Sequence, residues 1–235
     1  MQDISASLGL ALSLIASGDG DLYQIILLSL RVSLTAVAVS CLIGLPLGAL
    51  LAISRFQGRG GVLVLVNALM GLPPVVVGLL VYLHLSRSGP LGWLGLLYTP
   101  TAMIIAQAIL ITPIIIALSR QVIEDLDVEY RELFRSLSVP WHGRIGALIW
   151  DGRFSLLTVA LAGFGRAVAE VGAVIIVGGN IENLTRVMTT AIALETSKGD
   201  LALALALGIV LLALALVINA LVMSVRLTAE RHAYA

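Results

Sequence analysis

Five stretches of this sequence are each long and apolar enough to cross a lipid bilayer. A hydrocarbon core about 30 Å thick requires about 20 apolar residues in a helix. Inside lipid the backbone has no water to bind, so each stretch is expected to be helical. The stretches are residues 31–53, 62–85, 96–118, 154–177 and 201–225. The sequence therefore predicts an all-α membrane protein with five transmembrane helices.

Composition supports this class of protein and argues against others. Apolar residues make up 59% of the chain and charged residues 12%, whereas a soluble domain has about 25% charged residues. The formal net charge is zero, which gives no reason to expect a nucleic acid as a partner. One cysteine and three scattered histidines form no metal-ligand pattern. We therefore expect the lipid membrane to be the main surrounding of the chain, with no metal and no nucleic acid.

Positive charge is distributed unevenly over the connections between the spans. Nine arginines lie in the first connection, the third connection and the tail, and three basic residues lie on the other side. The nine are Arg55, Arg59, Arg120, Arg131, Arg135, Arg144, Arg153, Arg226 and Arg231, and the three are Arg87, Arg186 and Lys198. Because basic connections stay on the cytoplasmic side, we expect the N-terminus outside and the C-terminus inside a cell (inner or plasma) membrane.

We divide the chain into three parts. Residues 1–21 form an N-terminal periplasmic or interfacial segment, residues 22–226 the transmembrane domain, and residues 227–235 a cytoplasmic tail. The transmembrane part contains one large polar loop, residues 120–153, which is expected in the cytoplasm.

The polar loop 120–153 predicts an amphipathic helix. Glu124 and Asp127 are expected at its start and Arg135 toward its end, because that arrangement complements the helix dipole. Its apolar residues recur at three- and four-residue spacing and form one stripe. They are Leu126, Tyr130, Leu133, Phe134 and Leu137. Such a helix can lie on the membrane surface or dock against a partner.

The same loop resembles the coupling motif of binding-protein-dependent ABC importer permeases. In that motif a Glu-Ala-Ala triplet is followed by three residues and a glycine, and nine residues later by Ile-x-Leu-Pro. Residues 132–134 align with the triplet through the identical Glu132, Ser138 takes the glycine position, and residues 148–151 take the last element. Ser138 and Asp151 depart from the motif.

Further segments are similar to oxyanion permeases. Residues 71–78, 89–92 and 106–108 resemble the permeases for molybdate, tungstate and sulfate. Residues 165–173, 177–181 and 185–195 look most like the tungstate branch. The resemblance covers about residues 22–225 and implies the type I ABC importer permease fold, with a cytoplasmic coupling helix.

The resemblance also implies a function and partners. It implies a permease that imports a tetrahedral oxyanion, tungstate by its best likeness, with molybdate or sulfate as alternatives. The partners would be a cytoplasmic ABC ATPase dimer, a periplasmic or lipid-anchored oxyanion-binding protein and a second copy of this chain. ATP and Mg would bind to the ATPase. No cofactor is expected to bind to this chain, which has no Gly-rich phosphate loop. An intramembrane enzyme is the alternative from another class, but the spans hold no pair of acids and no serine with histidine suited to it.

Three groups of candidate site residues follow from this comparison. ATPase coupling is expected from Glu129, Glu132, Leu133, Phe134, Arg135, Leu137, Ser138 and Pro140. The hypothetical substrate path comprises Pro73, Pro74, Gln107, Thr112, Arg166, Glu170 and Asn180. Docking of the binding protein is assigned to Arg87, Arg186 and Lys198.

Alternatives remain open for the path residues. Arg166 and Glu170 are four residues apart, so they can form a pair that fixes helix packing. Arg166 can instead lower the barrier for a dianion, because its planar fork suits oxyanions. Pro73 and Pro74 can line the path or only adjust packing. The Gly178–Asn180 segment can be a helix stop or an anion entrance.

Overall fold

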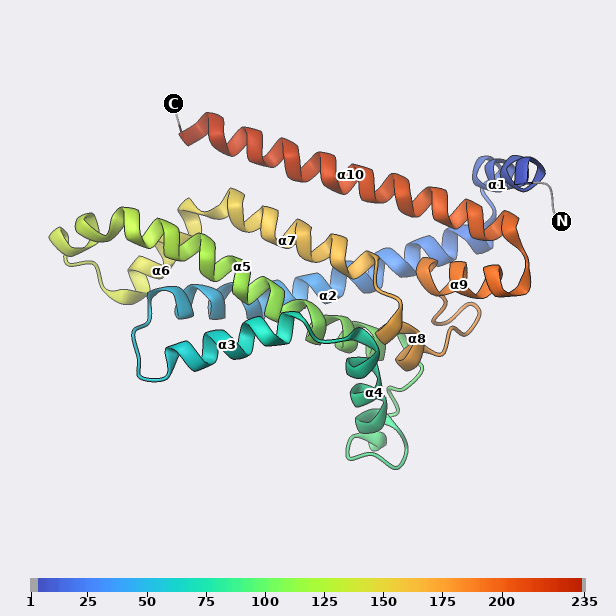
Figure 1. The fold of residues 1–235 in the computed structure, drawn as a ribbon, viewed down its shortest axis with the longest axis horizontal. Coiled ribbons are helices and arrows are strands. Elements are labelled where there is room, and N and C mark those ends of the chain that lie inside the picture. Colours follow the sequence, from blue (N-terminus) through green and yellow to red (C-terminus); the bar gives the residue numbers. More distant parts are fainter. Residues whose placement is uncertain (1–3, 234–235) are drawn as a thin grey trace. The chain divides into compact units, whose positions relative to one another are not determined.

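The computed structural model describes the backbone of residues 4–233 and the side chains of residues 8–224. The predicted N-terminal segment and tail therefore fall partly outside the described residues. The described part contains helices and no strand, which confirms the all-α prediction (Figure 1). The helices are α1 (Ile4–Ser17), α2 (Gly20–Ile53), α3 (Arg59–Met70), α4 (Pro74–Leu85), η1 (Gly92–Leu94), α5 (Pro100–Ser136), α6 (Trp141–Asp151), α7 (Arg153–Val168), α8 (Gly172–Gly178), α9 (Met188–Lys198) and α10 (Leu201–Ala233).

Among the described residues, three helices are long and apolar enough to cross a membrane. They are α2, α5 and residues Leu201–Ser224 of α10, and they correspond to the first, third and fifth predicted spans. The helix pairs α3–α4 and α6–α7 each add one span if the pair is counted as a single broken segment, which gives up to five. The second pair is bent by 71°.

The second and fourth predicted spans are interrupted. The second breaks between α3 and α4, where Leu72 and Pro73 each precede a proline. The residue before a proline avoids helical backbone angles, and proline itself supplies no N–H group. The fourth breaks after Val168, and helix resumes only at Gly172. A continuous helix over residues 154–177 is therefore wrong.

The predicted helix start in the polar loop is also wrong. Helix α5 runs without interruption from Pro100 to Ser136, so Glu124 and Asp127 lie in its interior. Proline and glycine are absent between Pro113 and the end of α5, and no residue there interrupts the helical hydrogen bonds. Only residues 137–140 and α6 therefore stand apart from the third span.

The chain forms two compact units. The first unit comprises the residues up to Ala36, Pro73–Gln107 and Gly165–Ile218. The second unit comprises Val37–Leu72, Ala108–Phe164 and the chain from Asn219 onward. Helices α2, α5, α7 and α10 contribute residues to both units.

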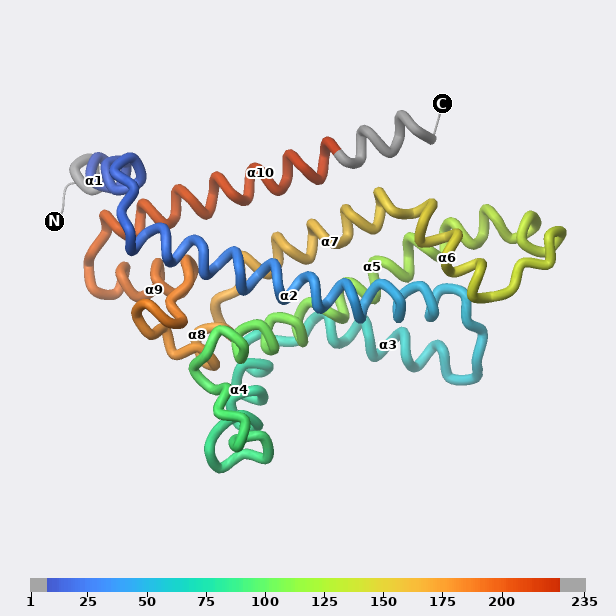
Figure 2. Tube along the Cα trace, turned by 180° about the vertical axis from the view of Figure 1, so that it is seen from behind, coloured from blue at the N-terminus to red at the C-terminus, as the bar shows by residue number. Residues whose placement is uncertain are grey.

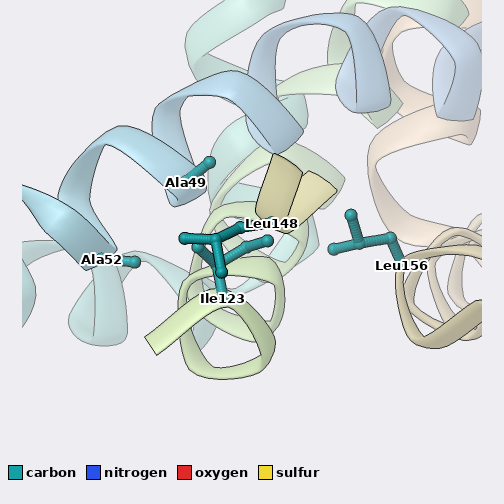
Figure 3. Close-up of a cluster of buried hydrophobic side chains, with 5 residues drawn as sticks. All are labelled: Ala49, Ala52, Ile123, Leu148 and Leu156. Carbon is teal, nitrogen blue, oxygen red and sulfur yellow. The ribbon is translucent and has the colours of Figure 1, made fainter. Parts of the chain in front are cut away.

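The core of the second unit joins α2, α5, α6 and α7. Figure 3 shows Ala49 and Ala52 on α2, Ile123 beside Leu148, and Leu156 on α7. All five side chains are buried. Helices α2 and α5 approach closely at Gly48, where a Cβ atom would lie 2.8 Å from the carbonyl oxygen of Ile116. Small residues therefore set the separation of these two helices.

The first unit packs α4 against α8 and α9 against the start of α2. A Cβ atom on Gly78 would lie 2.8 Å from Cα of Ala173, so the two backbones are in direct contact. The backbone N–H of Met188 donates to Oγ of Ser29 at 2.7 Å, and Figure 2 shows α9 beside the first turns of α2. Several large apolar side chains of this unit stay exposed, among them Leu27, Leu212 and Leu216. Apolar exposure of this extent is typical of a surface covered by lipid.

Candidate functional site

The predicted coupling residues lie at the end of α5, in the following turn and at the start of α6. The backbone N–H of Val139 donates to the carbonyl of Phe134 at 3.0 Å, and that of Ser138 donates to Arg135 at 3.1 Å. Ser138 has φ +50°, and Pro140 is the residue before the first turn of α6. The backbone thus reverses tightly, with a left-handed residue where the family motif has glycine.

Most of these side chains point to solvent. The exposed ones are Glu129, Glu132, Leu133, Arg135, Leu137, Ser138 and Pro140. Leu133 and Leu137 expose 50% and 65% of their surface, and the neighbouring Trp141 exposes 65%. Apolar groups exposed beside charged ones are typical of a surface that binds another protein.

Phe134 is the exception among the coupling residues. Its ring is half-buried, 5.9 Å from the ring of Tyr130, and the guanidinium of Arg144 lies 5.7 Å from its centre. The hydroxyl of Tyr130 donates to the carboxylate of Asp151 at 2.9 Å. Phe134 therefore stabilises the α5–α6 contact and is less exposed than the other coupling residues.

Two carboxylates hold this region together. Asp127 is buried and forms an ion pair with Arg144 of α6, while Arg131 lies 3.9 Å away on its own helix. Glu124 pairs with Arg59 of α3 at 3.0 Å and with Arg120. The Asp127–Arg131 spacing is visible in the sequence as an i,i+4 pair. The Asp127–Arg144 and Glu124–Arg59 pairs are separated by 17 and 65 residues and depend on the fold.

The left-handed backbone at Ser138 leads to a first prediction. Replacement by glycine, Ser138→Gly, is expected to keep the turn, because glycine adopts positive φ without steric cost. Ser138→Val is expected to destabilise the turn by about 1–2 kcal/mol, since a β-branched side chain clashes with the backbone there. Thermal melting of the purified chain should show the difference. Ser136→Val is the matched control, because Ser136 is helical; equal melting of the two valine variants would contradict the prediction.

The path residues Arg166 and Glu170 lie at the break between α7 and α8. Their side chains approach to 3.6 Å, with 45% of the Arg166 side chain exposed and 5% of the Glu170 side chain. Oε1 of Glu170 also accepts the backbone N–H of Ala173 at 3.2 Å, in the first turn of α8. The hydroxyl of Thr189 donates to the backbone carbonyl of Glu170 at 2.8 Å. Glu170 therefore stabilises the interrupted backbone as well as the guanidinium.

Gln107 is buried close to this break. Its Nε2 donates to the carbonyl of Ala167 at 3.1 Å, and its Oε1 has no partner among the described residues. A cavity of about 10 Å³ is lined by Gln107, Glu170, Thr189, Ser29 and Ser33, among others. That volume is about the size of one water molecule.

The other path residues have different surroundings. Pro73 is the residue before α4, and Pro74 is the first residue of this helix. Thr112 belongs to the second unit, where its hydroxyl donates to the carbonyl of Ala108 at 2.7 Å and contacts Oγ of Ser40 at 3.2 Å. Asn180 follows the left-handed Gly179, itself has φ +51°, and donates through Nδ2 to the carbonyl of Thr190 at 3.2 Å. The Gly178–Asn180 segment thus has the geometry of a helix stop.

The three basic residues assigned to docking are not equivalent. Arg87 is exposed between α4 and η1. Arg186 exposes 13% of its side chain and lies 3.5 Å from Glu182 and 3.9 Å from Glu195. Lys198 donates to Glu195 at 3.0 Å. Carboxylates of the same unit therefore largely neutralise Arg186 and Lys198. The Glu182–Arg186 and Glu195–Lys198 spacings of four and three residues are visible in the sequence, whereas the contact of Arg186 with Glu195 depends on the fold.

The helical spans, the lipid-facing apolar surface and the polar α5–α6 region define a multi-pass membrane protein. The chain belongs to the family of binding-protein-dependent transport system inner membrane components, whose sequence pattern matches residues 44–226. This confirms the predicted family and fold, and it makes the chain a transport subunit of the inner membrane. A binding-protein-dependent system also implies a binding protein as a partner.

The chain is similar to several permeases over most of its length. It is 41% identical to a tungstate uptake system permease protein of Peptoclostridium acidaminophilum, over 96% of this chain and 99% of that protein. It is also 41% identical to a probable anion ABC transporter permease protein of Haloferax volcanii, over 85% and 88% of the two chains. The chain is 30% identical to a molybdenum transport system permease protein of Escherichia coli, over 72% of this chain and 77% of that protein.

Proposed function

We propose that this chain is the membrane-spanning permease of an ABC importer that carries tungstate into the cytoplasm. The observation that carries the proposal is the near full-length similarity to a tungstate permease at 41% identity, against 30% over a shorter range for a molybdenum permease. Molybdate and sulfate are the alternative substrates.

The importer is proposed to contain two copies of this chain, an ABC ATPase dimer and a periplasmic or lipid-anchored oxyanion-binding protein. ATP and Mg bind the ATPase in this scheme. The excess of arginine in the first and third connections supports a cytoplasmic location for the α5–α6 region and an outer location for the N-terminus. Arg87 is the exposed docking candidate that forms no ion pair with a carboxylate of the described residues, unlike Arg186 and Lys198.

The exposed end of α5 is proposed to transmit ATPase movement to the spans. Helix α5 supports this role because it is continuous from Pro100 to Ser136. A displacement at Glu132 can therefore move the third span directly, without bending an intervening loop. The buried pair Asp127–Arg144 makes α6 move with α5.

The break at Arg166 and Glu170 is proposed to lie on the substrate path. A guanidinium exposed to lipid at the bilayer centre costs roughly 2.5–3.5 kcal/mol on insertion scales. The exposed part of Arg166 therefore requires a polar neighbour, either a water-filled path or the second copy of the chain. A tetrahedral dianion matches the charge and the planar fork of this arginine.

Uptake by the reconstituted complex tests the proposed substrate. The complex would be supplied with labelled tungstate and an excess of unlabelled tungstate, molybdate or sulfate. We expect ATP-dependent uptake for which molybdate and sulfate compete at least tenfold less well than tungstate. Stronger competition by molybdate or sulfate would reassign the substrate, and uptake that persists without ATPase or binding protein would contradict an ABC importer.

Truncation of Glu132 tests the proposed coupling surface. In Glu132→Ala we expect substrate-stimulated ATPase activity of the assembled complex to fall by about tenfold, because loss of one charge-assisted hydrogen bond costs about 1.5–3 kcal/mol. Membrane insertion should be normal, since this side chain is exposed. The control is Asp125→Ala, another exposed acid of α5 outside the coupling set. The assignment is refuted if both variants of the intact complex hydrolyse ATP at the parent rate.

A further inference from the structure

The second unit contains a cavity of about 860 Å³ that the coupling function does not explain. It lies where α2 ends and α3 begins, and residues of α5 and α6 complete its wall. Five arginines line it, namely Arg55, Arg59, Arg131, Arg135 and Arg144, together with the carboxylates Glu124 and Asp127. Five positive against two negative groups leave an excess of three positive charges.

The two carboxylates fix the arginines without neutralising the cavity. Glu124 binds Arg59 at 3.0 Å and also Arg120, which lies outside the lining. Asp127 binds Arg144 and lies 3.9 Å from Arg131. Each carboxylate is therefore already shared by two guanidinium groups. These pairs hold Arg59, Arg131 and Arg144 in place before any ligand arrives, which reduces the ordering cost of binding for these three side chains.

Arg55 and Arg135 carry two of the three unbalanced charges, and the third arises because Arg131 and Arg144 share one carboxylate. Both side chains are exposed, and no carboxylate of the described residues forms an ion pair with either. Guanidinium groups bind phosphate-like oxyanions through two parallel N–H bonds, which a lysine cannot do. Since the lining contains arginines and no lysine, its chemistry suits a tetrahedral oxyanion with several oxygens.

We propose that this arginine cavity binds a tetrahedral oxyanion group, either the phosphate of an anionic phospholipid headgroup or a free oxyanion. Its position favours the lipid. Arg55 and Phe56 lie two and three residues after Ile53, the last residue of α2, and Phe56 exposes 46% of its surface. Aromatic and basic residues at the end of a spanning helix lie at headgroup level, and basic clusters on the cytoplasmic side attract anionic lipids. The cytoplasmic placement rests on the orientation proposed above.

A binding experiment on the purified full chain in a neutral detergent tests the cavity. The probes are dioctanoyl phosphatidylglycerol, its zwitterionic phosphatidylcholine counterpart and sodium tungstate. Three single variants are compared with the parent chain, namely Arg55→Gln, Arg135→Gln and Arg153→Gln. Each removes one exposed positive charge of the second unit, but Arg153 lies outside the cavity. Native mass spectrometry and titration calorimetry give the stoichiometry and Kd.

We expect phosphatidylglycerol to bind the parent chain more tightly than phosphatidylcholine. Its Kd should rise about tenfold in Arg55→Gln and Arg135→Gln, which is the loss of one charge-assisted contact, and stay unchanged in Arg153→Gln. The same arginine dependence for tungstate would make a free oxyanion the ligand.

Two results would overturn the proposal. One is that no probe distinguishes the parent from the two cavity variants, and the other is that Arg153→Gln weakens binding equally. The measurement needs no transport, so a failure here leaves the proposed substrate untouched. A failure of tungstate uptake likewise leaves this site untouched.

Discussion

Asp127→Ala is expected to lower the stability of the second unit more than any other change in the α5–α6 region. The substitution removes a buried carboxylate and leaves Arg144 partly buried without its partner. Breaking a buried pair from one side costs roughly 3–5 kcal/mol. We expect about 2–3 kcal/mol here, because Arg144 retains 26% exposure and water screens part of its charge. The melting temperature in detergent should fall by roughly 5–10 °C.

A double variant separates the lost ion pair from a lost side chain. In Asp127→Leu/Arg144→Met both charges are replaced by apolar groups, and most of the stability should return because no buried charge remains. The control Asp125→Ala removes an exposed acid of the same helix and should melt like the parent. A double variant as unstable as Asp127→Ala would show that the ion pair is not the cause.

The polar loop illustrates how far sequence reasoning reaches. The apolar stripe was predicted correctly as helical up to Phe134, whereas Leu137 lies in the turn after α5. Leu126, Tyr130 and Phe134 do pack against the buried cluster. Its remaining members, Leu133 and Leu137, are exposed instead. The helix start was misplaced because the dipole argument treated Glu124 and Asp127 as capping groups. Arginines supplied by α3, α6 and α5 itself stabilise these acids in the helix interior.

The two interruptions of the spans differ in whether their cause is visible in the local sequence. The break before α4 is local, because Pro73 and Pro74 are visible in the sequence and their backbone limits are known. The break after Val168 contains no proline. It is stabilised by the carboxylate of Glu170 on the N–H of Ala173 and by the hydroxyl of Thr189 on the carbonyl of Glu170. The second of these contacts spans 19 residues, so a pattern of local residues gives no sign of it.

The left-handed turn at Ser138 was indicated by the family alignment but not by the residue itself. Alignment with a glycine of the family motif indicated that the position is special, although serine has no preference for positive φ. The backbone angle of +50° gives the physical reason for glycine at that position. A resemblance can therefore locate a conformational requirement that the residue itself does not reveal.

Arg166→Ala is expected to reduce tungstate uptake by at least tenfold while the complex stays assembled. A dianion crossing the membrane meets a high electrostatic barrier, and a positive charge beside its path lowers that barrier. Loss of about 1.4 kcal/mol of this stabilisation is already a tenfold change in rate. Arg166→Lys should be intermediate, because it keeps the charge but loses the planar fork. Initial uptake rates per assembled complex measure the effect, with Arg31→Ala as the control for loss of an exposed arginine of the first unit.

The alternative role of Arg166 makes a different prediction. If the pair with Glu170 only fixes helix packing, Arg166→Ala would lower the melting temperature, because it leaves the 5%-exposed carboxylate of Glu170 without its cation. Uptake per folded complex and the preference for tungstate over molybdate would then be unchanged. If Arg166 instead lines the path, uptake rate and selectivity change as well, because its exposed guanidinium then acts directly on the anion. A variant with parent-like uptake and selectivity in a folded complex would therefore remove Arg166 from the path.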